Sequence, residues 1–162
     1  LDPTDVTTLL NVAAQKARDL AADRDAPVLI EMSAGMPSVS IDRVRMPQAL
    51  ATLIAHALRT TDAAMVRLLV SLEGERLIRI EIELATQHFN PSRMEAMLDP
   101  NRDPGVSEHR GLALGLRLAR AVTELHGGQV RVVRRGTTGG AFSVVLPVSR
   151  TPARSVTLSP LS

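Results

Sequence analysis

The chain has 162 residues, the size of one compact domain with a single core, and 44% of them are hydrophobic while 22% are charged. This composition excludes a wholly disordered, collagenous or coiled-coil chain. The absence of cysteine excludes disulfides, thiolate metal sites and a cysteine nucleophile. Tryptophan and tyrosine are absent and the formal net charge is only +2, so neither base stacking nor strong positive charge favours nucleic-acid binding.

No apolar run approaches the roughly 20 residues that a membrane-spanning helix needs, so we expect a domain that is not embedded in a membrane. The chain begins at Leu1 rather than at Met. We therefore expect a piece of a longer polypeptide. We place this piece in the cytoplasm and leave open whether the rest is anchored in a membrane.

In the first third of the chain, apolar residues recur at helical spacing over residues 6–21 and again from about Met46 to Leu58. Pro47 suits the first turn of the second helix. Two short strands are predicted between these helices, at residues 28–32 and 39–41.

Two longer strands follow, at residues 66–72 and 78–84, because their apolar residues alternate with period two around a turn at Gly74. The intervening positions of the second strand hold Arg79, Glu81 and Glu83. Such polarity predicts a sheet that is covered on one side only.

The last part of the chain is predicted to contain a short helix, an irregular loop over residues 99–110, a helix over 112–125 and a hairpin over 130–146. We assign residues 1–148 to one domain and residues 149–162 to a disordered tail rich in Ser, Thr and Pro. The fold class is α/β of the α+β kind: a two-layer sandwich in which about three helices cover one face of a mixed, mostly antiparallel sheet.

Three segments carry a resemblance to a known family. They are Gly111-Leu112-Ala113-Leu114-Gly115-Leu116, the run from Ala119 to Gly128 that ends in His126-Gly127-Gly128, and the run from Gly139 to Pro147. In this order and spacing they resemble the end of the ATP-binding domain of sensor histidine kinases, the GHKL group with the Bergerat fold. The resemblance extends over almost the whole chain up to Pro147 and implies the same one-sided sheet.

The resemblance also implies where a nucleotide pocket would lie. Two asparagines that hold Mg²⁺ in the family correspond to Thr52 and His56, and a basic residue on the phosphate side corresponds to Arg59. The aspartate that reads the adenine amine corresponds to Leu84, because the inward alternation of Ile80 and Ile82 continues to that position.

The glycines of the family's GxGLGL run correspond to Gly111 and Gly115, with Ala113 in the middle place. In the family these glycines let backbone amides approach the triphosphate. The glycines of the pattern that follows the adenine-binding aspartate are replaced by Thr86 and His88. We therefore predict a degenerate pocket that holds neither nucleotide nor metal, with no catalytic residue.

Other polar residues have two interpretations. His56 is either a partly buried histidine bonded to a neighbour or a ligand or phosphoacceptor. His88 and His109 are either loop histidines or acid–base or metal groups. Asp99, Asp103 and Glu108 fall in the loop that corresponds to the ATP lid, where solvation explains them. Five arginines suggest either a basic patch or a solvated face: Arg117, Arg120, Arg131, Arg134 and Arg135.

Three functions remain open from the sequence. The first is a kinase-derived signalling domain that has lost ATP binding and acts on proteins, namely the dimerisation and phosphoacceptor helices of its parent chain and a response regulator. The second is an active kinase domain that binds ATP and Mg²⁺ and phosphorylates a histidine outside this chain. The third is a stand-alone regulator that resembles anti-sigma-factor kinases. Nucleic acid is expected as a partner in none of them.

Overall fold

The structure is a computed structural model that describes residues 1–103, 107–136 and 139–149, with only the backbone described for residues 107–109. The described helices are α1 (Val6–Leu20), α2 (Arg45–Thr60), α3 (Pro91–Leu98) and α4 (Ser107–Leu125). The described strands are β1 (Asp2–Thr4), β2 (Val28–Met32), β3 (Val39–Ile41), β4 (Val66–Glu73), β5 (Leu77–Leu84), β6 (Gln129–Arg134) and β7 (Gly140–Pro147).

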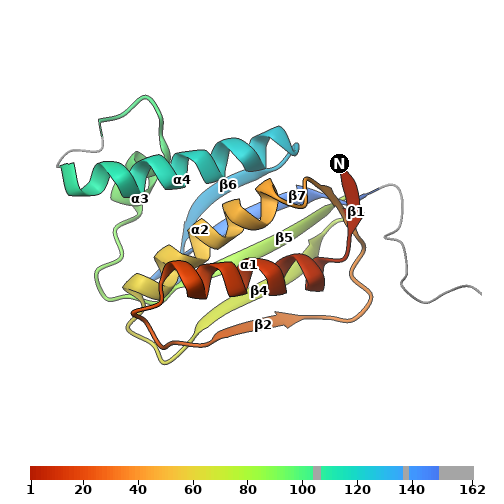
Figure 1. Ribbon diagram of the computed structural model, residues 1–162, viewed down its shortest axis with the longest axis horizontal. Coiled ribbons are helices and arrows are strands. Elements are labelled where there is room, and N and C mark those ends of the chain that lie inside the picture. The colour runs from red at the N-terminus through yellow and green to blue at the C-terminus, as the bar shows by residue number, and fades with distance from the viewer. Residues whose placement is uncertain (104–106, 137–138, 150–162) are drawn as a thin grey trace, which may run out of the picture.

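In the part of the chain that the structure describes, the main sheet has five strands in the order β2-β4-β5-β7-β6. Among these described strands, only the β2–β4 pair is parallel, and the other neighbours are antiparallel. Helices α1, α2 and α4 lie side by side over one face of this sheet, and the short helix α3 packs beside α4 and β6 (Figure 1). The predicted two-layer fold with a mixed sheet is therefore confirmed, with α3 as a fourth helix.

The core lies between the helices and the inner face of the sheet. On β5, Ile80 and Ile82 are fully buried, and they pair with Val70 and Leu68 of β4, respectively. On the other side of β5, Ile82 pairs with Phe142 of β7, which is also fully buried. The alternation expected from the sequence is thus the alternation observed.

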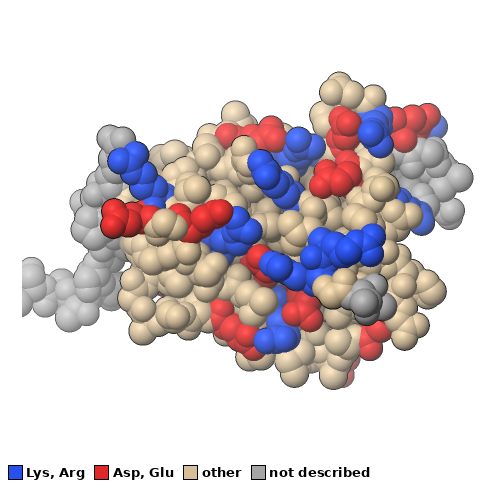
Figure 2. Space-filling model, turned by 180° about the vertical axis from the view of Figure 1, so that it is seen from behind, with Lys and Arg blue, Asp and Glu red and all other residues tan. Residues whose placement is uncertain are grey.

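The outer face of the sheet carries charged side chains of both signs, which Figure 2 shows side by side. Arg67 forms an ion pair of 2.8 Å with Glu31 and a second one of 3.8 Å with Glu83. Arg135 pairs with Glu81. Because opposite charges alternate here, this face is a solvated surface, and the prediction that the sheet is covered on one side only is confirmed. These partly exposed pairs contribute about 0–1 kcal/mol each.

Short polar residues cap the starts of α1 and α3. The Asp5 side chain accepts hydrogen bonds from the backbone amides of Thr7 and Thr8 at the start of α1. Asn90 accepts one from the Arg93 amide at the start of α3, where Pro91 occupies the first turn. Both arrangements satisfy amides that have no partner inside the helix.

Two short features were not predicted from the sequence. Strand β1 pairs antiparallel with β3, and three residues that include a proline are too few to show an alternating pattern. Ser149, placed in the predicted tail, is held by its backbone amide, which donates to the Ser38 carbonyl at 2.7 Å. The rest of the predicted tail lies outside the described residues.

Helix α4 begins at Ser107, whereas the sequence predicted an irregular loop through residue 110. That prediction was wrong because residues 107–110 are all polar and Gly111 follows them, so this first turn carries no apolar periodicity. In the described part of the chain, no helix has the length and apolar character needed to cross a bilayer.

Arg117 on α4 binds the C-terminal end of α3. Its guanidinium donates to the carbonyls of Met97 at 3.0 Å, Ala96 at 3.2 Å and Arg102 at 2.7 Å. Arg120, one turn later, donates to the Leu98 carbonyl at 3.3 Å. Carbonyls at the end of a helix have no partner inside it and carry partial negative charge, so two arginines suit this place. Helix α3 is thereby fixed against α4.

We predict that Arg117→Met, which keeps the aliphatic stem and removes the guanidinium, lowers the free energy of unfolding by about 1–3 kcal/mol. Urea denaturation monitored by circular dichroism measures this change. The matched control is Arg110→Met on the same helix. Because this side chain is exposed, its replacement should change the free energy of unfolding by no more than about 0.5 kcal/mol. Equal effects of the two substitutions would contradict the role given to Arg117.

Candidate functional site

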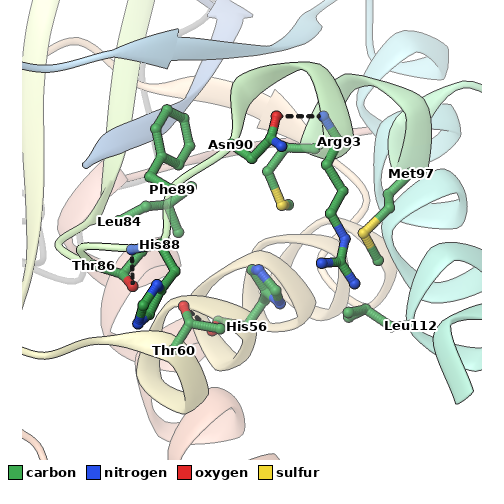
Figure 3. Close-up of a pocket in the computed structure, with 11 residues that line it drawn as sticks. His56, Thr60, Leu84, Thr86, His88, Phe89, Asn90, Arg93, Met97 and Leu112 are labelled. Carbon is green, nitrogen blue, oxygen red and sulfur yellow. Dashed lines mark hydrogen bonds between the residues drawn. The ribbon is translucent and has the colours of Figure 1, made fainter. Parts of the chain in front are cut away.

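A cavity of about 270 Å³ opens between α2, the end of β5, the loop that follows β5, α3 and α4 (Figure 3). It is lined by His56, Thr60, Leu84, Thr86, His88, Phe89, Asn90, Arg93, Met94, Met97 and Leu112. Its floor is apolar and its rim is polar, because Leu84, Met94 and Met97 are buried whereas His88 and Arg93 are exposed. None of the described lining residues is a carboxylate.

The loop from β5 to α3 is held in place by hydrogen bonds to the end of α2. The Asp62 amide donates to the Ala85 carbonyl at 2.8 Å, and the Asp62 carboxylate accepts from the Gln87 amide at 2.9 Å. Within the loop, the Thr86 hydroxyl oxygen accepts from the His88 amide at 3.2 Å. These hydrogen bonds fix the backbone of the loop, and the backbone in turn sets where the loop side chains lie on this side of the cavity.

Leu84 ends β5 with its side chain inward, as predicted, and it is only 2% exposed. Its strand partner is Gly140. A Cβ atom on Gly140 would lie 2.3 Å from Cζ of Phe89, so only a glycine allows the Phe89 ring to lie against this strand. Leu84 and Phe89 together form an apolar wall at the end of the sheet.

His56 on α2 is 8% exposed, and its ring lies 5.8 Å from that of Phe142, tilted by 55°. Burial, and to a smaller extent the positive charge of Arg59, lowers the pKa of His56 to about 4. No described residue forms a hydrogen bond with its ring nitrogens. His56 is thus a buried helix histidine, but the expected hydrogen bond from its ring to a neighbour is not found among the described residues. With this pKa the imidazole is neutral at neutral pH.

The remaining predicted pocket positions do not line the cavity. Thr52 faces Gly115 across the contact of α2 with α4, where a Cβ on Gly115 would lie 3.4 Å from the Thr52 methyl carbon. The Thr52 hydroxyl donates to the Gln48 carbonyl at 3.1 Å. Gly111 and Gly115 lie inside α4 and not before it. Since the helix begins at Ser107, its open amides lie N-terminal to the glycine segment.

Arg59 also lies away from the cavity. Its guanidinium donates to the Leu20 carbonyl at the C-terminal end of α1, at 2.6 Å. The phosphate-side role that the resemblance implied has no support in this geometry. Arg59 instead joins the ends of α1 and α2.

The other polar candidates are spread over the surface. His88 is on the rim of the cavity, and Asp99 accepts a hydrogen bond from the Asn101 amide at 2.9 Å and pairs with Arg102 at 3.5 Å. The side chains of Glu108 and His109 lie outside the described residues. Among the side chains that are described, no group of three or more His, Cys, Asp or Glu residues could hold a metal ion.

Sequence reasoning missed Thr60, Asn90 and Arg93 as cavity residues. A signal for Arg93 was present, because Arg93 and Met97 are four residues apart on a helix that Asn90 and Pro91 begin, and therefore share a face. Thr60 lies one helical turn after His56 and could have been found in the same way.

Comparison with known proteins bears on this geometry. Residues 41–150 match the family described as "Histidine kinase-, DNA gyrase B-, and HSP90-like ATPase". The chain belongs to this family. The match includes α2, β5 and α4, which contribute to the cavity, so the cavity lies inside the ATPase-like domain.

Three relatives show how far this similarity extends. The alginate biosynthesis sensor protein KinB of Pseudomonas aeruginosa is 26% identical over 145 residues, which cover 89% of this chain and 24% of KinB. The adaptive-response sensory kinase SasA of Prochlorococcus marinus is 28% identical, covering 95% of this chain and 42% of SasA. The histidine protein kinase DivJ of Caulobacter vibrioides is 30% identical, covering 78% and 21%. The chain thus spans less than half the length of these relatives.

Two solved structures have the same fold as this ATPase-like domain. Full-length ShkA in complex with AMPPNP superposes with a TM-score of 0.76 at 22% identity, covering 94% of this chain and 32% of ShkA. The nucleotide-free catalytic domain of the histidine kinase ThkA has a TM-score of 0.70 at 18% identity, covering 91% and 97%. The fold is therefore that of histidine kinase catalytic domains.

The lowered pKa of His56 predicts a pH dependence of stability. In the unfolded state His56 binds a proton near pH 6.5, and in the folded state only near pH 4. The contribution of neutral His56 to the free energy of unfolding is therefore complete above pH 6.5 and is lost as the pH falls from 6.5 toward 4. Relative to His56→Leu, the wild-type chain should lose about 2 kcal/mol of unfolding free energy between about pH 7 and pH 5.

Urea denaturation of both proteins at several pH values measures this difference. Groups whose titration the two proteins share, such as Asp42 and Glu73 with their lowered pKa values, cancel in the comparison. Parallel pH profiles for the wild type and His56→Leu would show that His56 is not a buried neutral imidazole.

Proposed function

We propose that this domain is the ATPase-like part of a sensor histidine kinase, or of a phosphotransfer protein derived from one, in two-component signalling, and that it no longer binds Mg-ATP. The family match and the sensor-kinase relatives support the first part. The second part rests on Leu84. This buried apolar side chain stands in the cavity where the family resemblance places an aspartate that binds the adenine amine.

The energetic cost of this replacement supports the proposal. A leucine accepts no hydrogen bond, and an amine left without a partner in a closed site costs about 1–3 kcal/mol, which weakens binding roughly ten- to a hundredfold. The nearest acidic residue along β5 is Glu83, whose side chain lies on the outer face of the sheet and pairs with Arg67. No small movement of β5 would bring it to the cavity.

The described lining of the cavity offers magnesium only a poor set of ligands. Mg²⁺ requires a set of oxygen ligands, and carboxylates are its usual protein partners. The described lining offers the hydroxyls of Thr60 and Thr86 and the amide of Asn90, but no carboxylate. The Thr60 hydroxyl already donates to the His56 carbonyl at 3.0 Å. This set is poor for a hard divalent ion.

An active kinase and a stand-alone regulator are the competing functions. An active kinase domain has to bind Mg-ATP and donate the γ-phosphate to a histidine outside these 162 residues, and Arg59 is turned away from the cavity where that charge would be needed. A stand-alone regulator of the anti-sigma type would bind a partner protein without dimerisation helices. The two experiments below separate these cases.

We predict that ADP with Mg²⁺ at millimolar concentration leaves the thermal unfolding midpoint of the wild-type chain unchanged. A ligand present at about 100 times its Kd would add about 2.7 kcal/mol to the unfolding free energy, which a thermal scan detects easily. Leu84→Asp alone should not create binding, because the magnesium ligands stay absent. Saturable stabilisation of the wild type would favour the active kinase, and strong binding by Leu84→Asp would contradict the account of a multiply altered site.

A row of exposed leucines on α4 supports an action on proteins. Leu114, Leu118 and Leu125 are 70%, 63% and 78% exposed, and the exposed Ala121 lies between the last two. Their spacing of four, three and four residues puts them on one face, opposite the buried Ala113, Leu116 and Ala119. We call Leu114, Leu118, Ala121 and Leu125 the α4 stripe.

The α4 stripe fits an amphipathic helix as its partner. A soluble domain gains nothing from three leucines in water, and a row of apolar residues at helical spacing is the surface that packs on another helix. We propose that the partner is the pair of dimerisation and phosphoacceptor helices, with a response regulator docking nearby, and we place the domain in the cytoplasm, where such a regulator would meet it.

Cross-linking tests this surface directly. The 162 residues contain no cysteine, so Leu118→Cys carries a single cysteine-directed photo-crosslinker in this domain. In a polypeptide that joins this domain to its dimerisation helices, we expect cross-links from Leu118→Cys to those helices. Leu72→Cys, a position on β4 that is 46% exposed, is the control and should give none. Equal cross-linking from both positions, or none from Leu118→Cys, would reject the α4 stripe as the docking surface.

A further inference from the structure

The two edges of the main sheet are protected to different degrees. At one edge, the short helix α3 packs beside β6, and its Glu95 side chain accepts a hydrogen bond from the Val132 amide at 3.2 Å. Strand β6 also carries Arg131 and Arg134, and charged side chains discourage pairing with a further strand. At the opposite edge lies β2, and Figure 1 shows no described helix or strand along its outer side. The edge at β2 therefore lacks the protection that β6 has.

The backbone of β2 has groups without partners along this edge. At the start of the β2–β4 ladder, the Val66 amide donates to the Pro27 carbonyl at 2.9 Å. Because alternate residues of a strand bond to the same neighbour, the amides and carbonyls of Val28, Ile30 and Met32 point away from β4. Among the described residues, no hydrogen bond reaches these amides and carbonyls. The edge is therefore a template for one more strand.

The side chains of β2 leave apolar surface uncovered at the same edge. Val28, Ile30 and Met32 pack against the core but stay partly exposed, whereas Leu68, the β4 partner of Ile30, is fully buried. On the outer face of the sheet, Leu29 is 43% exposed. Strand β2 contains neither lysine nor proline, the residues that commonly protect an edge. Pairing with another strand would thus bury apolar surface and also supply partners for the backbone.

The residue pattern of β2 is complementary to itself. When two copies run antiparallel about Ile30, Val28 lies opposite Met32 of the second copy, and Ile30 lies opposite its own counterpart. Every outward amide and carbonyl of β2 then finds a partner. Leu29 lies opposite Glu31 of the second copy, so no two like charges face each other directly. A two-fold symmetric contact requires such a self-complementary surface.

The charges near β2 permit this association. The Glu31 carboxylate forms an ion pair of 2.8 Å with Arg67 of its own chain, so it brings no unbalanced charge to the pairing. The formal net charge of the chain is only +2, so two copies repel each other weakly. A pairing of five residues is smaller than the interface of a stable dimer, so the association should be weak and dependent on concentration.

We propose that β2 is an interaction surface whose partner is β2 of a second copy of this chain, paired antiparallel about Ile30 so that one sheet continues through both copies. This inference goes beyond the proposed function, since it uses neither the cavity nor the α4 stripe. The expected dissociation constant lies between about 1 µM and 1 mM, the range of weak association.

Sedimentation equilibrium of the wild-type chain at concentrations up to about 1 mM tests whether this dimer forms. Two variants at Leu29 then test which residues face each other, because a charge at this position lies opposite Glu31 of the second copy twice in each dimer. Like charges repel and opposite charges attract in such a pair. Leu29→Glu should therefore dimerise about two- to thirtyfold more weakly than Leu29→Lys.

The matched control is the same pair of substitutions at Leu114, which is 70% exposed on α4 and far from β2 (Figure 1). Leu114→Glu and Leu114→Lys should have equal dissociation constants. A larger difference at Leu114 than at Leu29 would place the contact on the α4 stripe and overturn the proposal.

Disulfide cross-linking tests the register. The chain has no cysteine, so a single introduced cysteine forms a disulfide only between copies. In the proposed register the Cα atoms of Ile30 and its counterpart lie about 5.5 Å apart, within the range of a disulfide. Ile30→Cys should therefore give a disulfide-linked dimer on mild oxidation. Leu29→Cys is more exposed but should give none, because Leu29 lies opposite Glu31 and not opposite its own counterpart.

The proposal is overturned if the wild-type chain stays monomeric up to about 1 mM, if Leu29→Glu and Leu29→Lys dimerise equally, or if Leu29→Cys cross-links as readily as Ile30→Cys. Circular dichroism shows whether each variant is folded. If Ile30→Cys does not fold, the comparison at the exposed Leu29 decides the question. Binding of Mg-ADP bears on the proposed function alone, so a failure of either proposal is distinguishable from a failure of the other.

Discussion

Strand β5 is the centre of the sheet, and its two neighbours decide which of its side chains face the helices. Ile80 and Ile82 are locked inward by pairing with β4 and β7, so Leu84 must follow them and Glu83 must face outward. A slip by one residue would expose these isoleucines to water at about 1.5–3 kcal/mol each and bury acidic side chains in their place. No single hydrogen bond to a ligand, worth about 1–3 kcal/mol, could offset that loss. The register of β5 therefore fixes the chemistry at the end of the strand.

The helices have the family's architecture, and two positions to which the resemblance assigns ligand roles make packing and helix-end contacts in this chain. Where the resemblance implies ligands for magnesium and phosphate, Thr52 packs against Gly115 between α2 and α4, and Arg59 binds the end of α1. Packing and helix-end contacts thus account for positions to which the resemblance assigns ligand roles. The fold persists because its core is intact, and a fold by itself does not imply the chemistry carried on it. What remains at the centre is a cavity with Arg93 at its rim and no carboxylate among its described lining residues.

Much of this could be predicted from the sequence, for physical reasons that differ between segments. Period-two alternation is strong on β4 and β5, so their inner and outer faces, including the inward Leu84, were predicted correctly. The first turn of α4 was missed because it has no apolar residue to reveal its period. The position of Arg59 was missed because local spacing does not show which carbonyl a long side chain will reach. The cavity is lined by residues from five separate elements, and only the tertiary fold shows that these elements meet.

The most direct test is a crystal structure of this chain grown with Mg²⁺ and ADP at millimolar concentration. Our account predicts the Leu84 side chain inside the cavity, Glu83 on the outer face beside Arg67, and no adenosine phosphate between α2 and the sheet. A purine seated in that space, or a carboxylate turned inward at the end of β5, would contradict it.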